Sequence, residues 1–459
     1  MTLLPGRGSP TPRATPAVPH CGGQCSADMA RGDLSTQSAG QEAGFAASLG
    51  PLLILALLIA VGFTAMGSFG MVQESAKVEL HLSDTALGLL QGLGAAVPLV
   101  VFSVPIGILV DRYNRVRLLV GLMLLWTLGT ALTAAAPDVS TLFAARMLTG
   151  IGVTGALTAA LSLSADFCRP AQRGRALLIV NLGKSLGTAA AFALTGWIFG
   201  LLAHGAVPAG LAMAPWRGAH AILAGIGLLL SLPLLALREP PRHEVEAAPN
   251  SPFRVVAAEL WARREFLAPL FAGQVAVVMA DAAAGIWVSP VLQRSYGLSP
   301  EDFGGWVGAI VFISGVLGSM LGGASADLGQ KSSVRGGLLV GAVIAAGVGV
   351  PSALFPVMPN VLAFGAALFV LVLCGAITGL VVSVALTVWL PNELRGLSIG
   401  AFIAVAGLIG FGLAPSLVTV VSGVLGGETH LGQGLAVVGV VTSALSFLAF
   451  IQAMRRAPI

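Results

Sequence analysis

The sequence predicts an all-α membrane protein with twelve transmembrane helices in two pseudo-symmetric six-helix bundles. Only 10% of the 459 residues are charged, 56% are hydrophobic, and the mean hydropathy is +0.91. Soluble domains carry about 25% charged residues, so a water-soluble fold could not hide this much apolar side chain. The composition therefore indicates that lipid surrounds most of the chain.

Long apolar runs predict the spanning helices. A helix that crosses a bilayer needs about 20 apolar residues, and open sheets are excluded because unpaired backbone groups are costly in hydrocarbon. The 60 glycines are spread through these runs, where small residues allow helices to approach closely. Twelve runs meet the length criterion, at 50–72, 86–110, 116–136, 140–163, 174–200, 217–237, 267–290, 304–326, 335–355, 360–388, 396–421 and 434–454.

The segments outside these runs predict the domain organisation. The first 48 residues are rich in Pro, Gly, Ser and Thr and lack the apolar core of a signal peptide. A polar stretch with prolines and mixed charges separates the sixth and seventh runs. The expected organisation is a disordered cytoplasmic tail (1–48), an N-terminal bundle (49–237), a cytoplasmic linker (238–266), a C-terminal bundle (267–454) and a cytoplasmic tail (455–459).

Lysine and arginine in the links predict the orientation. Sixteen of them fall in links on one side, whereas the other side receives Lys77, Arg217 and Arg294. Because cations are retained in the cytoplasm, both termini are expected there, in a multi-pass protein of the cytoplasmic (inner) cell membrane. The net charge of +4 follows from this topology and gives no reason to expect nucleic acid.

Two matches at nearly the same offset predict an internal duplication. Arg173 and Arg395, each followed by glycine, open the fifth and eleventh runs and lie 222 residues apart. Asp111 and Asp327 follow the second and eighth runs and lie 216 residues apart. Duplicated six-helix halves are a transporter architecture, with the substrate site between the halves near the bilayer midplane.

The link after the second run carries a family signature. "GILVDRYNRVR" (107–117) resembles the G-x-L-x-D-R-x-x-R-R/K signature of the major facilitator superfamily, and "ARMLTGIGVTGA" (145–156) resembles its Arg-bearing motif in helix four. The resemblance covers residues from about 50 to 454. It implies the twelve-helix fold and transport of small molecules.

Two further stretches resemble the spinster-like lipid transporters within that superfamily. They are "LSDTALGLLQ", ahead of the signature, and "RGRALLIVNLGKSLG", after helix four. Spinster-like members carry an Asp-Arg pair in helix one and an acid beside the helix-four glycines. This chain has Met66-Gly67 and Val153 at the corresponding places.

The acid in the signature predicts a gate on the cytoplasmic side. A helix N-terminus carries roughly half a positive charge, so Asp111 could lie against the amides at Arg395 where helix eleven begins. Asp327 would form a weaker counterpart in the other half. The alternative is that the arginines of this link only fix the topology. The predicted gate comprises Asp111, Arg112, Arg115, Arg173, Arg175, Asp327 and Arg395.

Charged residues inside the apolar runs predict the transport site, because a charge in hydrocarbon costs about 3 kcal/mol. Asp281 could bind and release a proton, or form a structural buried pair. Lys184 could bind an anionic substrate group or pair with Asp281. Arg146 could contact the substrate or hydrogen-bond to neighbouring helices. Other residues that could line the cavity, or only join helices, are Asn181, Gln91, Gln274 and Trp287.

These features predict a secondary active transporter that moves a small amphipathic, drug-like or lipid-like solute by alternating access, coupled to protons. The alternatives are a uniporter or uptake carrier for a small organic anion, which would use Lys184 and Arg146, and a membrane-embedded enzyme or receptor. The histidines lack metal-ligand spacing and no Walker lysine is present, so no cofactor, metal or enzymatic activity is expected. The expected partners are the solute, protons and lipid, around a monomer.

Overall fold

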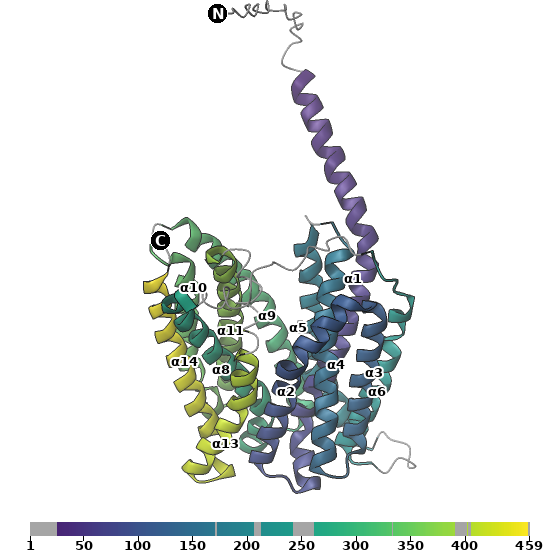
Figure 1. Cartoon of the computed structure of the whole chain (residues 1–459). Coiled ribbons are helices and arrows are strands. Elements are labelled where there is room, and N and C mark those ends of the chain that lie inside the picture. Colours follow the sequence, from purple (N-terminus) through teal and green to yellow (C-terminus); the bar gives the residue numbers. More distant parts are fainter. Residues whose placement is uncertain are drawn as a thin grey trace, which may run out of the picture. The chain divides into compact units, whose positions relative to one another are not determined.

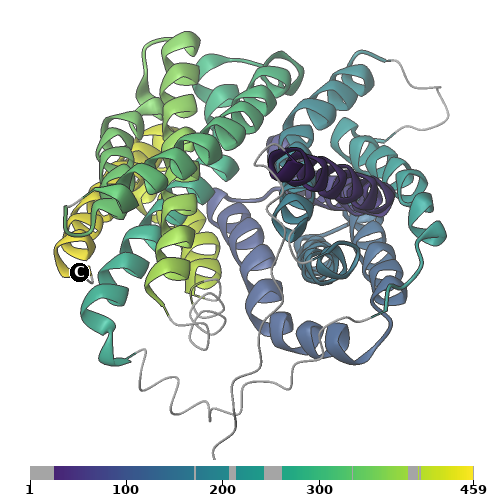
Figure 2. The same cartoon turned by 90° about the horizontal axis from the view of Figure 1, so that it is seen from above.

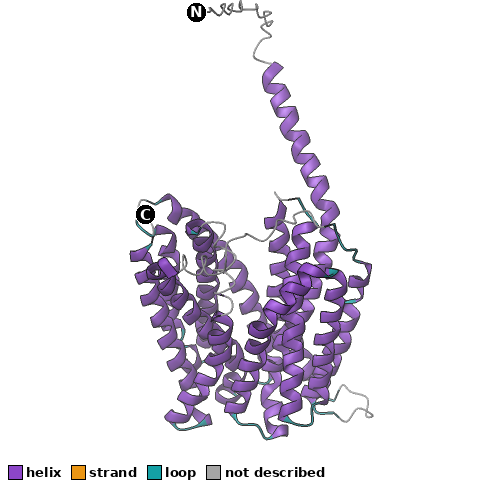
Figure 3. Ribbon diagram, in the orientation of Figure 1, coloured by secondary structure: helices purple, strands orange, loops and turns teal. Residues whose placement is uncertain are grey.

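A computed structural model describes residues 25–169, 172–205, 213–241, 261–332, 334–390, 402 and 405–457. The chain divides into two units, Met1–Leu49 and Gly50–Ile459, and the second unit contains the helical bundles. In the described residues we find helices and turns and no strand (Figure 3). Twelve helices in this part of the chain are long and apolar enough to cross a membrane, which confirms the predicted fold class.

The N-terminal half is built from helices joined by short capped links. Ser83 accepts a hydrogen bond from the amide of Ala86 at 3.1 Å, and Asn114 and Asp138 begin the next two helices in the same way. Such caps satisfy amides that have no partner within the helix. The helices are α1 (Cys25–Leu80), α2 (Asp84–Arg112), α3 (Arg115–Ala135), α4 (Val139–Asp166), α5 (Arg173–Ala203) and α6 (Pro215–Leu230), followed by the turn η2 (Leu232–Ala236).

The helices of the C-terminal half are also capped at their ends. Gly297, with φ 67°, ends the first of its helices, and Ser299 with Asp302 forms a capping box at the start of the next. The elements are α8 (Arg264–Tyr296), α9 (Pro300–Lys331), η3 (Gly337–Leu339), α10 (Val340–Ser352), η4 (Phe355–Val357), α11 (Val361–Trp389), the π-helix η5 (Ala406–Leu413), α13 (Ala414–Leu425), η6 (Glu428–His430) and α14 (Leu431–Arg456).

One boundary differs from the sequence-based expectation. Helix α1 begins at Cys25, inside the segment predicted to be a disordered tail. No proline lies between Pro19 and Pro51, and the intervening sequence contains several strong helix formers. The start predicted for the eleventh run, at residue 396, lies outside the described residues, as does most of the predicted linker.

Within the Gly50–Ile459 unit, α1 to α6 form one group of helices and α8 to α14 form the other (Figures 1 and 2). Glycines bring the two halves into backbone contact along two seams. A methyl group added at Gly196 of α5 would lie 2.6 Å from the carbonyl oxygen of Pro300 in α9. One added at Gly92 of α2 would lie 2.7 Å from the carbonyl oxygen of Gly412 in η5. Small residues thus join the halves, as is common between helices in lipid.

Each half also has a hydrophobic core of its own. One cluster of buried side chains, which includes Trp126, lies in the N-terminal half, and another, which includes Phe450, lies in the C-terminal half. A third cluster joins the halves and includes Phe69 of α1, Trp287 of α8 and Phe303 of α9. Each half therefore has its own core, and an apolar cluster joins the halves in addition to the two glycine seams.

Candidate functional site

The helices of the Gly50–Ile459 unit begin and finish at two ends of the bundle. We call the end that carries η6 the Glu428 end; α1 and α8 finish there and α2 begins there. We call the end where α2 finishes the Asp111 end. Charged residues that lie far apart in sequence gather at the Glu428 end.

Arg294, near the end of α8, contacts two acids of the other half. Its guanidinium group donates to both carboxylate oxygens of Glu74 in α1, at 2.9 and 2.6 Å. It also donates to both oxygens of Asp84, the first residue of α2, at 2.7 Å each. Such two-pronged pairing is the strongest geometry available to arginine and a carboxylate.

Lys77 and Glu428 complete this group, which we call the end cluster (Glu74, Lys77, Asp84, Arg294 and Glu428). The ammonium of Lys77 lies 2.6 Å from Asp84 and 2.5 Å from Glu428. The amide of Asp84 donates to the second Glu428 oxygen at 2.8 Å. Three of the five residues come from the N-terminal half and two from the C-terminal half, so the end cluster ties the halves together at the Glu428 end.

Uncharged hydrogen bonds continue this connection towards the membrane interior. Gln91 donates to Gln73 at 2.8 Å, and Gln73 donates to the carbonyl oxygen of Ile286 in the other half at 2.6 Å. Ser289 donates to the carbonyl oxygen of Met71 at 2.8 Å. Gln91, predicted as a cavity residue, is therefore buried in a polar link between α2, α1 and α8.

The residues of the predicted gate lie at the Asp111 end or beyond the described residues. Asp111 and Asp327 are exposed at the ends of α2 and α9. Arg115 is buried and contacts Asp166 of α4 at 2.5 Å and Glu239, which follows η2, at 2.8 Å. Arg112 is exposed, and Arg173 and Arg175 lie in the first turn of α5. The predicted contact with Arg395 lies outside the described part of the chain.

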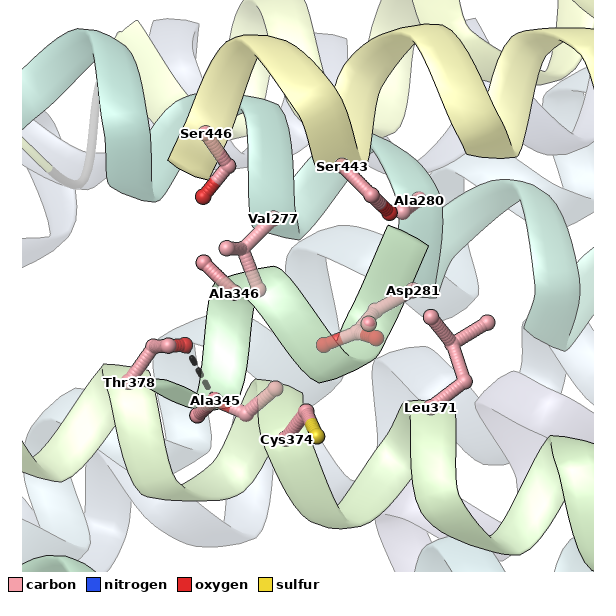
Figure 4. Close-up of a pocket in the computed structure, with 12 residues that line it drawn as sticks. Val277, Ala280, Asp281, Ala345, Ala346, Leu371, Cys374, Thr378, Ser443 and Ser446 are labelled. Atoms are coloured by element: carbon pink, nitrogen blue, oxygen red, sulfur yellow. Dashed lines mark hydrogen bonds between the residues drawn. The ribbon is translucent and has the colours of Figure 1, made fainter. Parts of the chain in front are cut away.

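Asp281 borders a small, mostly apolar cavity inside the C-terminal half (Figure 4). The cavity has a volume of about 20 Å³ and is enclosed by α8, α10, α11 and α14. The Oδ1 atom of Asp281 is buried and has no hydrogen-bond partner. The other oxygen lies against Gly375 of α11, because a methyl group added at Gly375 would come within 2.1 Å of it. Glycine at this position therefore provides the space that the carboxylate occupies.

Gln274 lies two turns before Asp281 on the same face of α8, since the two residues are seven positions apart. Its side-chain oxygen is also buried without a partner. Its nitrogen faces Gly379 of α11, where an added methyl group would be 3.7 Å away. Trp287 is fully buried, donates to the carbonyl oxygen of Pro415 at 3.1 Å and belongs to the apolar cluster that joins the halves.

The two membrane cations lie in the N-terminal half. Lys184 is exposed, and its ammonium is 5.5 Å from the centre of the Phe63 ring. Asn181 lies one turn away on the same face of α5 and donates to the carbonyl oxygen of its own Leu177 at 2.9 Å. Lys184 and Asp281, both among the described residues, form no ion pair within 4.0 Å. The two residues are therefore not paired in this structure, in which Asp281 lies against Gly375 inside the other half.

Arg146 is 8% exposed and anchors α4 to α1. Its guanidinium donates to the carbonyl oxygens of Ala65 and Met66 and lies 5.5 Å from the centre of the Phe69 ring. This arrangement matches the hydrogen-bonding alternative for Arg146 more closely than a contact with solute. Among the described residues, no group of three or more His, Cys, Asp or Glu side chains is placed to hold a metal.

A second and larger cavity lies between the two halves and is lined mainly by apolar side chains. An apolar groove of about 470 Å³ runs along α5 and α9, between side chains that include Leu186, Trp197 and Phe312. Leu186 follows Lys184 by two residues, which places it about 200° round the helix. The groove therefore opens away from the polar face of α5.

Comparison with known proteins agrees with this architecture. The fold is similar to the crystal structure of a bacterial homologue of the human lysosomal transporter spinster, in an inward-facing and unoccupied conformation, with a TM-score of 0.74. The two share 21% sequence identity, over 89% of this chain and 98% of that one. This likeness establishes the fold.

Two curated relatives match parts of this chain. An MFS-type efflux pump of Mycolicibacterium smegmatis is 26% identical over 60% of this chain and 61% of its own length. Protein spinster homolog 1 of Rattus norvegicus is 30% identical over 53% of this chain and 47% of its own length. The chain thus covers less than two thirds of either relative, and the resemblance to spinster seen in the sequence recurs in both comparisons. The family model of the Major Facilitator Superfamily matches residues 52–415, and the chain therefore belongs to this family of membrane transporters.

Proposed function

We propose that this transporter moves a small amphipathic solute across the cytoplasmic membrane by alternating access, with proton exchange at Asp281. The observation that carries the proposal is the end cluster, which joins the two halves at the Glu428 end. Alternating access requires contacts of this kind that form in one state and break in the other. The two glycine seams supply the surfaces on which the halves could rock.

We assign the Glu428 end to the outside and the Asp111 end to the cytoplasm. The excess of Lys and Arg in the links at the Asp111 end supports this orientation. The similar spinster homologue was solved in an inward-facing conformation. A chain that is tied together at its outer end would correspond to that state.

Asp281 is the proposed coupling residue because it is an acid within a membrane-spanning helix and has an unpartnered oxygen. A carboxyl group in such a place is stable when it carries a proton and costly when it is charged and alone. The amphipathic solute is suggested by the apolar composition of the spanning helices and by the relative that is an efflux pump.

Transport by reconstituted protein tests the coupling. A ligand-stabilisation screen with purified protein first identifies a solute, and its flux is then measured in proteoliposomes. Asp281→Asn is expected to keep exchange of solute for solute and to lose accumulation driven by a pH gradient. Glu265→Gln, at the exposed start of the same helix, serves as the matched control. Full pH-driven accumulation by Asp281→Asn would exclude this residue as the coupling site.

A small organic anion is the second candidate solute. Lys184 favours it, because this exposed cation in α5 contacts a phenyl ring and forms no ion pair with a described acid. Lys184→Ala should then weaken binding of anionic solutes about tenfold, the effect of about 1.4 kcal/mol, while leaving neutral analogues unaffected. An equal loss for both classes would indicate that Lys184 has a structural role.

A further inference from the structure

Four side chains with oxygen atoms reach the cavity beside Asp281, whose wall is otherwise apolar. The hydroxyl oxygen of Ser446 in α14 and the Oδ1 atom of Asp281 are both buried and have no hydrogen-bond partner. Thr378 of α11 donates to the carbonyl oxygen of Gly375 at 2.9 Å, which leaves its own oxygen free to act as an acceptor. Ser443 of α14 adds another hydroxyl group (Figure 4). No described lysine, arginine or histidine lines the cavity.

The size of the cavity limits what it can hold. Its volume of about 20 Å³ is slightly more than the roughly 10–15 Å³ that a single water molecule requires. Only one water-sized particle therefore fits. A larger organic ion is excluded.

The charge of the lining selects the particle further. A lone carboxylate in the membrane interior needs a proton or a cation beside it. Carboxylate and hydroxyl oxygens are hard ligands, which suit hard metal ions. One carboxylate balances one positive charge, so a divalent ion would leave the buried site with an excess charge. These constraints favour a small monovalent cation.

We propose that this cavity is a binding site for one sodium ion, which competes with a proton for Asp281. The inference rests on the proposed role of Asp281 as the coupling carboxylate and adds a second ion to it. The ion would contact Asp281 from α8, Thr378 from α11, and Ser443 and Ser446 from α14. Cys374 of α11 is the other titratable group in the lining, and neither α10 nor α14 contributes one.

The position of the site separates it from the solute. The cavity lies between helices of the C-terminal half, whereas Lys184 and Arg146 belong to the N-terminal half. Gln274 offers an unpartnered oxygen about 10 Å along α8 from Asp281, towards the Asp111 end. Cation binding would therefore act on the solute through the packing of α8 against α11 and α14.

Thermal unfolding of the purified full chain tests this site directly. Sodium chloride, potassium chloride and choline chloride are compared at equal ionic strength and constant pH. A bound ion stabilises the folded protein by mass action, so sodium should raise the Tm by at least about 2 °C over choline. Raising the proton concentration should reduce this sodium-specific shift.

Variants of the lining residues test whether the sodium-specific shift of the Tm arises from this cavity. Asp281→Asn should abolish the sodium-specific shift, and Ser446→Ala should reduce it if the carboxylate variant does not fold. Ser319→Ala, an exposed serine of α9 that bonds its own helix, should keep the full shift. No sodium-specific shift in the unmodified protein, or a full shift in Asp281→Asn, would overturn the proposal.

Transport measurements keep the two proposals apart. Accumulation driven by a pH gradient and unaffected by sodium, together with no thermal shift, removes the sodium site and leaves proton coupling in place. A sodium-specific shift that depends on Asp281, without any pH-driven accumulation, supports the sodium site and removes proton coupling.

Discussion

Replacing Arg294 with alanine should open the Glu428 end. In the folded chain this guanidinium group bridges Glu74 and Asp84, and the Asp84 side chain is only 4% exposed. Removing one partner of a buried ion pair costs about 3–5 kcal/mol. Since Lys77 still contacts Asp84 and Arg294 is itself 23% exposed, we expect the tied state to lose about 2–3 kcal/mol. The equilibrium between the two states should then shift by about 30- to 150-fold.

Distances between spin labels measure this shift. Val78 at the end of α1 and Val424 at the end of α13 are 74% and 84% exposed and belong to opposite halves. With the four native cysteines replaced, labels at these positions should show a new, longer distance in Arg294→Ala. Arg294→Lys, which keeps the charge but not the two-pronged geometry, should give an intermediate population.

A matched control is available in the same half. Arg456 contacts Glu265 at 2.8 Å, but this pair is 58% and 69% exposed and does not cross between the halves. Arg456→Ala should leave the distances unchanged. If Arg294→Ala gives the same distances as the unmodified protein, the end cluster does not hold the halves together.

Two further predictions concern the cavity and the orientation. Gly375→Ala should lower the Tm by several degrees, because the added methyl group would lie 2.1 Å from Asp281. Gly379→Ala, whose methyl group would lie 3.7 Å from its nearest neighbour, should change the Tm by less than about 1 °C. Equal changes of Tm in the two variants would contradict this prediction. In intact cells, a membrane-impermeant thiol reagent should label Glu428→Cys and not Arg456→Cys, and the reverse pattern would invert the proposed orientation.

The fold was predictable from the sequence because lipid imposes a simple rule. Each spanning helix needs a long apolar run, and the twelve runs found in the sequence all correspond to helices in the described chain. Helix ends were less predictable, since charged residues such as Glu74 and Arg294 extend α1 and α8 beyond their apolar runs. Charged side chains near the ends of spanning helices can contact water or pair with one another, so a helix can continue past its apolar run.

The end cluster was missed because its members are distant in sequence. Arg294 pairs with residues 210 and 220 positions earlier, and by itself it counts only as a cation in a link. The sequence did identify Asp281 as an acid inside a spanning helix. It could not show that this side chain points towards Gly375 rather than Lys184, because helical periodicity fixes a face of α8 and not the neighbour that the face meets.

The end cluster also bears on how tightly a solute would bind from each face of the membrane. A site that is accessible in only a fraction of molecules binds with an apparent affinity reduced by that fraction. Each 1.4 kcal/mol that the cluster adds to the tied state therefore weakens binding from the Glu428 end about tenfold. A solute arriving from the Asp111 end meets no such reduction. The same binding residues would thus show one apparent dissociation constant for solute from the Glu428 end and another for solute from the Asp111 end. The five charged residues of the end cluster would set the ratio of these constants without contacting the solute.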